Sequence, residues 1–176
     1  MSGRTEGGRS RKEQNYCGGL LSLAICLASI PPAHAACPIE LAVYGEKNQA
    51  AEIDFRPATD AATVTNSFKM VIGNFVLDGF VQWTEGESRP WGTLHYNCPT
   101  GDVTGEEYAA CTVWQGIVYT ASEQGVVDLL PAQGMPAPKR LILADLGPSL
   151  KAATAFGPAG LTKIPFDVFE MKGCQE

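Results

Sequence analysis

The stretch from Cys98 to Ala121 constrains the fold of this chain more than any other. A strand-like run ends at Cys98, a polar loop follows, and Cys111 opens a second strand-like run. Two successive strands that meet at a hairpin base bring such cysteines within bridging range. The stretch therefore predicts two antiparallel strands joined by a loop that a disulfide closes.

Residues 1–35 have the pattern of a secretory signal peptide. A basic stretch at 9–12 precedes an apolar run at 17–30, and the chain then reads Ala-His-Ala, the small-x-small pattern of a cleavage site. The apolar run is too short to span a bilayer, which takes about 20 residues. We expect cleavage after Ala35, and a single mature β-rich domain over residues 36–176 that is periplasmic or secreted and is not stably inserted in a membrane.

Four cysteines remain after that cleavage, Cys37, Cys98, Cys111 and Cys174. An even number in an exported chain predicts disulfides, and four cysteines allow three pairings. We favour Cys98–Cys111 with Cys37–Cys174, since the second pair lies at the two ends of the mature chain. None of the four has the close spacing of a zinc site, and lipidation of Cys37 is the alternative that would break the second pair.

Strand patterns recur through the mature chain. Residues 51–56 alternate strictly between apolar and charged side chains, which predicts a half-buried strand. Asp78-Gly79 stands between two apolar runs and predicts a two-residue turn that pairs Leu77 with Phe80. Further strand-like runs begin at Ile39, Phe68, Gly92, Cys111, Gly125, Arg140 and Phe166.

One short helix near the C-terminus has clear boundaries. Pro148 suits its first turn, residues 149–156 suit its body, and Gly157 ends it. With the strands above, the pattern predicts a mainly β fold, a compact antiparallel sheet, sandwich or barrel of about eight short strands with two disulfides.

The charge of the mature chain excludes some partners. Residues 36–176 hold nine basic and seventeen acidic side chains, a net of −8. Nucleic acid and anionic membrane surfaces require clustered Lys and Arg, so neither is expected. A cationic protein or a small neutral ligand fits this charge better.

His95 is the only histidine of residues 36–176 and the one candidate for a general base. The alternation of its strand places it with Thr93 and Asn97 on the polar face, where we expect it to meet solvent. A small secreted hydrolase using His95 and loop carboxylates is one hypothesis, although no Gly-x-Ser-x-Gly motif is present.

Two sets of residues are candidates for binding. Asp102, Glu106 and Glu107 make the loop between Cys98 and Cys111 the most acidic short segment of the chain. Trp83 and Trp91 flank a second acidic loop, and their flat rings could contact sugars or apolar ligands. The acidic residues do not match an EF-hand calcium loop, so we predict neither a metal nor a cofactor.

These observations favour a non-enzymatic, exported binding or accessory protein of the cell envelope or periplasm. The Cys98–Cys111 loop would be its recognition element, because a clipped loop loses less conformational entropy on binding. Two alternatives stay open: the hydrolase described above, and a protein inhibitor that inserts this loop into the cleft of an extracytoplasmic enzyme.

Overall fold

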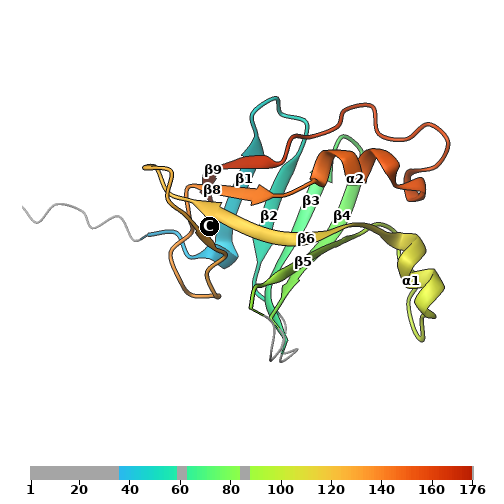
Figure 1. Ribbon diagram of the computed structural model, residues 1–176, viewed down its shortest axis with the longest axis horizontal. Coiled ribbons are helices and arrows are strands. Elements are labelled where there is room, and N and C mark those ends of the chain that lie inside the picture. The colour runs from blue at the N-terminus through green and yellow to red at the C-terminus, as the bar shows by residue number, and fades with distance from the viewer. Residues whose placement is uncertain (1–35, 59–62, 84–87, 176) are drawn as a thin grey trace, which may run out of the picture. The chain divides into compact units, whose positions relative to one another are not determined.

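An antiparallel β-barrel forms the described part of the chain (Figure 1). The computed structural model describes residues 36–58, 63–83 and 88–175, so the predicted signal peptide lies outside the described residues. Every strand pair is antiparallel. The strands are β1 (Ala42–Glu46), β2 (Glu52–Arg56), β3 (Val64–Ile72), β4 (Phe75–Gln82), β5 (Trp91–His95), β6 (Thr112–Ala121), β7 (Val127–Leu129), β8 (Arg140–Leu143) and β9 (Val168–Cys174).

Eight of these strands close the ring. Their order is β5-β4-β3-β2-β1-β9-β8-β6, and β6 pairs back onto β5. Strand β7 stands outside this order and pairs with the last residues of β6. The predicted mainly β, antiparallel class is confirmed, and the barrel is the form that it takes.

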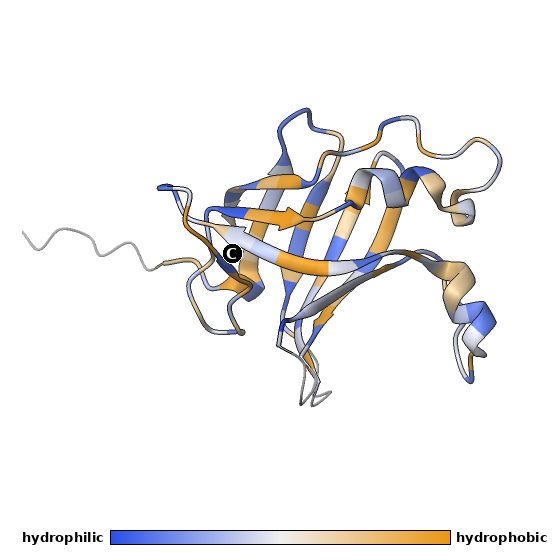
Figure 2. Ribbon diagram, in the orientation of Figure 1, coloured by the Kyte–Doolittle hydropathy of each residue, from blue (hydrophilic) through white to orange (hydrophobic). Residues whose placement is uncertain are grey.

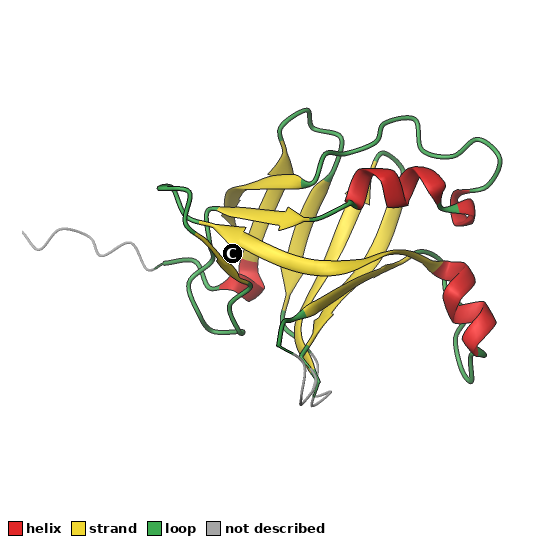
Figure 3. Ribbon diagram, in the orientation of Figure 1, coloured by secondary structure: helices red, strands yellow, loops and turns green. Residues whose placement is uncertain are grey.

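Helical segments are short; one precedes the first strand and the others connect strands (Figure 3). They are the 3-10 turns η1 (Ile39–Leu41) and η2 (Thr154–Phe156) and the helices α1 (Gly105–Cys111) and α2 (Leu146–Ala152). The predicted C-terminal helix is therefore present, with Pro148 in its first turn, but it begins three residues earlier and ends at Ala152 rather than before Gly157. Residues 154–156 of the predicted body form the 3-10 turn η2. Helix α1 was not predicted.

Side chains fill the barrel interior. Along β2, Ile53 and Phe55 are buried while Glu52 and Arg56 are exposed, as the alternation predicted. Figure 2 shows the same alternation of apolar and polar positions along other strands. An eight-stranded ring is narrow enough for side chains to occupy it completely. The largest fully buried ones are Trp114, Tyr44, Phe55, Phe169, Ile39, Ile53, Met70, Leu77, Leu94, Leu141, Leu143 and Leu146.

The predicted turn at Asp78-Gly79 is wrong. Both residues lie inside β4, which pairs with β3 along its whole length, and the chain turns at Gly73 instead, with φ +57°. A Cβ on Gly79 would lie 2.3 Å from the Phe68 ring. The glycine is thus needed for close packing inside the barrel and not for a turn, and Leu77 faces Met70 rather than Phe80.

Both predicted disulfides are confirmed. Cys37 and Cys174 have Cα atoms 5.7 Å apart, and those of Cys98 and Cys111 are 5.1 Å apart. The first disulfide lies beside the pairing of β1 with β9 and joins the two ends of the barrel chain.

Four predicted strand starts are wrong by two residues or more, among them those at Phe68 and Gly125, since β3 begins at Val64 and β7 at Val127. The chain enters β1 only at Ala42, because residues 39–41 form a 3-10 turn. It enters β9 only at Val168, and the Phe166 side chain before it is exposed.

Candidate functional site: the Cys98–Cys111 segment

The segment between Cys98 and Cys111 connects β5 to β6 and carries helix α1. The backbone turns out of β5 at Asn97, which has a positive φ of 55°. Cys111 is the last residue of the helix, and Thr112 begins β6. The disulfide therefore ties the start of the segment to the end of its helix.

A capping box begins helix α1. The Glu107 backbone N–H donates to Thr104 Oγ1 at 3.3 Å, and the Thr104 backbone N–H donates to Glu107 Oε2 at 2.9 Å. This exchange satisfies two donors that a helix start leaves without partners. Thr104-Gly105-Glu106-Glu107 matches the Thr-x-x-Glu pattern of such a start, which is the signal from which the helix could have been predicted.

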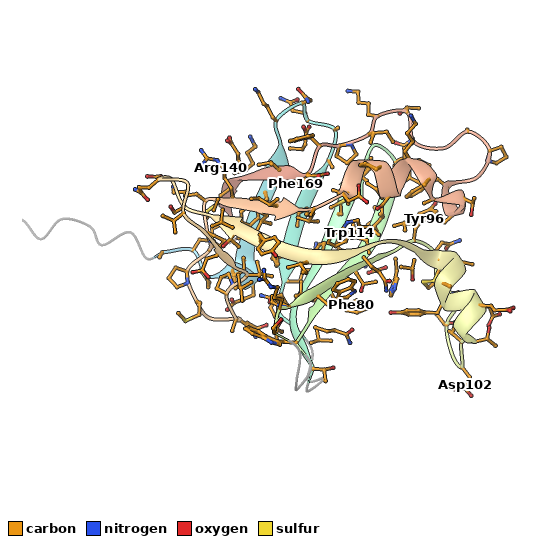
Figure 4. All side chains as sticks on the ribbon, viewed as in Figure 1. Phe80, Tyr96, Asp102, Trp114, Arg140 and Phe169 are labelled. Carbon is orange, nitrogen blue, oxygen red and sulfur yellow. A yellow bond between two sulfur atoms is a disulfide. The ribbon has the colours of Figure 1, made fainter. Side chains whose placement is uncertain are left out.

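The acidic side chains of the segment face solvent. Residues 104–110 are all exposed, and Figure 4 shows Asp102 at the outer tip of the segment. Hydrogen bonds from the Thr104 backbone and hydroxyl groups hold the pKa of the Glu107 carboxyl below its usual range. Glu107 therefore stays ionised while it caps the helix, whereas Glu106 takes no part in the capping box.

His95 lies beneath helix α1, and the prediction that it meets solvent is wrong. Only 8% of its surface is exposed. Its ring packs edge-on between Phe80, at a centroid distance of 5.1 Å, and Tyr108 of α1, at 4.5 Å. The Phe80 and Tyr108 rings cover the end of the outer face of β5 here, which strand alternation alone does not reveal.

The surroundings of His95 favour its neutral form. Burial lowers the pKa of the imidazole, and the nearby Asp78 carboxylate raises it by a smaller amount. Its Nε2 atom is buried and has no hydrogen-bond partner among the described residues. No described carboxylate lies in hydrogen-bond contact with His95, so the predicted hydrolase residues are not brought together.

Trp83 and Trp91 lie away from the acidic segment. They are 43% and 46% exposed. Trp91 begins β5, whereas the Cys98–Cys111 segment follows the end of the same strand. The two predicted sets of binding residues are thus at opposite ends of β5, and part of the acidic loop between the tryptophans lies outside the described residues.

Within residues 36–58, 63–83 and 88–175, no three His, Cys, Asp or Glu side chains are grouped to hold a metal ion. No helix there has the length and apolar character needed to cross a membrane.

Comparisons with known proteins add no relative. Searches of protein-family models, of curated proteins and of solved structures found no match to this chain. The function of this chain is therefore inferred from its own geometry.

Proposed function

We propose that this chain is an exported binding or accessory protein of the cell envelope, and that the Cys98–Cys111 segment is its recognition element. The observation that carries the proposal is the run of exposed residues at 104–110, which is held in one conformation from both ends. The disulfide, the capping box and the contact of Tyr108 with His95 hold it. Binding through such a segment loses little conformational entropy.

The charge of the segment indicates what it would bind. Asp102, Glu106 and Glu107 are exposed on it, and the domain as a whole is acidic. A protein surface rich in Lys and Arg would meet this segment with complementary potential, which raises association rates and specificity. Tyr108, 40% exposed at the same helix, supplies an aromatic contact of the kind enriched at interfaces.

The inhibitor alternative is supported by one observation. Helix α1 stands off the ring of strands in Figure 1, and a projecting, disulfide-tied segment has the form needed to enter an enzyme cleft. Such an inhibitor would still use the same acidic residues, so it is a special case of the binding proposal.

Export of the chain is supported by two kinds of observation. Disulfides form and persist in oxidising compartments outside the cytoplasm, and this chain has two. Residues 1–35 have the signal-peptide pattern. Intact mass spectrometry of protein exported by a bacterial host should find a chain that begins at Ala36, whereas a cytoplasmic, uncleaved product would overturn this part of the proposal.

Affinity capture from an extracytoplasmic fraction tests the recognition element. A Glu106→Gln, Glu107→Gln variant removes two charges, and glutamine at position 107 can still complete the capping box. The matched control is Glu52→Gln with Asp54→Asn, which removes two charges from the outer face of β2.

We expect wild type and the control to retain the same partner, and the α1 variant to lose it with at least tenfold weaker affinity for the purified partner. Equal retention by all three proteins would exclude the segment as the recognition element.

A further inference from the structure

A notch opens in the barrel wall where two strands share one edge of β6. Strand β5 pairs with the first part of β6, from Thr112 to Ile117, and β7 pairs with its last residues, from Tyr119 to Ala121. Strand β8 pairs with the same last residues of β6 along its other edge. Strands β5 and β7 therefore lie one after the other along the same edge of β6. A pocket of about 400 Å³ lies at this place and is lined by Ser88 and Arg89, which precede β5, by Tyr119 of β6, and by Val127, Asp128 and Leu129 of β7.

Arg89 is the cation of this notch. Its Nη1 donates a hydrogen bond to the Tyr119 hydroxyl, and its guanidinium carbon lies 5.6 Å from the centre of the Tyr119 ring. No carboxylate in the described ranges forms an ion pair with it. A guanidinium has five N–H donors in a planar fork that suits two carboxylate oxygens. With one hydrogen bond to Tyr119, most of the N–H groups of Arg89 are available to a ligand.

The other lining residues suit a polar, ring-shaped ligand. Val127 and Leu129 form an apolar wall, and Ser88 supplies a hydroxyl group. The register of β7 places Asp128 opposite Thr120, so its carboxylate, which accepts the Leu129 backbone N–H at 2.7 Å, lies on the other face of the strand from Tyr119. Sugars present hydroxyl groups to polar side chains such as Ser88 and flat C–H faces to apolar and aromatic side chains.

Trp91 extends the site along β5. It lies opposite Ile117 on β6, so its side chain is on the same outer face as Tyr119, two residues further on. Nearly half of its surface is exposed. An indole on that face next to the notch is a stacking platform for a second ring.

We propose that this notch binds a saccharide that carries a carboxylate group, with the carboxylate on Arg89 and the sugar rings against Val127, Leu129 and Trp91. Its volume falls within the range of about 300–1,000 Å³ typical of small-molecule sites. In an acidic domain, an arginine that lines a pocket and has no carboxylate partner among the described residues favours an anionic ligand there. The site is separate from the Cys98–Cys111 segment, and neither proposal depends on the other.

A matched pair of sugars tests the proposal. N-acetylmuramic acid and N-acetylglucosamine differ by a lactyl group with its carboxylate. We would titrate each into the full protein and follow backbone amide signals by NMR. We expect saturable shifts at residues 89, 119 and 127–129 with the acid, and at least tenfold weaker binding of the neutral sugar.

Variants then assign the carboxylate contact. Arg89→Gln should weaken binding of the acid at least tenfold, and Arg89→Lys should restore it only partly, because an ammonium group lacks the planar fork. Arg56→Gln, which removes an exposed arginine on β2, should leave binding unchanged. Unaltered amide spectra away from the notch would show that each variant is folded.

Three results would overturn the site. These are equal binding of the two sugars, wild-type affinity of Arg89→Gln, or shifts that map elsewhere than the notch. Binding of free amino acids in preference to the sugar acid would also exclude a saccharide site. The Glu106→Gln, Glu107→Gln variant should bind the sugar acid normally, so failure of this proposal and failure of the recognition segment are separable.

Discussion

At the scale of single residues, His95 couples the barrel to the segment above it. Its ring is the contact through which Tyr108 of α1 rests on β5. A charged imidazole would bury an additional N–H without a partner, because Nε2 already has none in the described structure. Protonation therefore opposes the packing that holds α1 in place.

This packing predicts a pH-dependent stability. Burial sets the folded-state pKa of His95 below its usual value of about 6.5, so the unfolded chain takes up the proton first as the pH falls. The stability that neutral His95 contributes is fully present above about pH 6.5 and is lost as the pH falls through the lowered folded-state pKa. Urea unfolding from pH 8 to pH 5 should show this decline in the wild type, and a His95→Gln variant should lack it. An identical slope in both proteins would contradict the assignment.

Gly79 is the second residue with a decisive local role. A methyl group at this position would overlap the Phe68 ring, whereas a methyl group at Gly173 in β9 meets nothing within 4 Å. We expect Gly79→Ala to lower the free energy of unfolding by about 1–3 kcal/mol through overpacking. Gly173→Ala should stay within about 0.5 kcal/mol of wild type. Urea denaturation of the two variants checks this, and equal effects would refute the packing role of Gly79.

At the scale of elements, the stability of helix α1 depends more on its N-terminal cap than on the helix propensity of its residues. A helix of seven residues is marginal alone. Its first turn is held by Thr104, and only Cys111 among its residues is buried. The capping box and the disulfide therefore replace the apolar face with which most helices are anchored.

Removing the cap should loosen this element without unfolding the barrel. Thr104→Ala should cost about 1 kcal/mol locally. Hydrogen exchange of the amides at 107–111 should become faster, while the barrel strands keep wild-type rates. Thr104→Ser, which preserves the hydroxyl group, should restore slow exchange. Uniform acceleration across the barrel would show instead that the cap stabilises the whole domain.

Element predictions from the sequence succeeded where one local pattern decides the outcome. Strict alternation at 51–56 and the cysteine positions both predicted what is observed. The turn prediction at Asp78-Gly79 was wrong because this dipeptide is compatible both with a turn and with a strand in which the glycine packs against an aromatic ring. The local sequence does not indicate which neighbouring strand supplies that ring. The turn and the packed glycine therefore cannot be distinguished from the sequence.

At the scale of the whole molecule, the two disulfides close loops of very different length. Cys37 and Cys174 are 137 residues apart, and Cys98 and Cys111 are 13 residues apart. In the chain-entropy model the longer loop stabilises the fold more, because its closure removes more freedom from the unfolded chain.

This difference gives a prediction for paired cysteine variants. Cys37→Ala with Cys174→Ala should lose about 5 kcal/mol of unfolding free energy, and Cys98→Ala with Cys111→Ala about 3 kcal/mol. Urea denaturation under non-reducing conditions measures both. A larger loss from the short loop would mean that the segment stabilises the barrel beyond its own closure.

The sequence by itself determined the β class and the acidity of the domain, and it predicted disulfides and favoured the pairing that the structure shows. Alternation, cysteine count and charge are local or additive properties, and they do not depend on which strands become neighbours. Only the tertiary structure decided that β6 closes onto β5, that α1 buries His95, and that β5 and β7 leave a notch beside Arg89. Each of these results from contacts between segments distant along the chain, whose partners are chosen by how the whole ring packs.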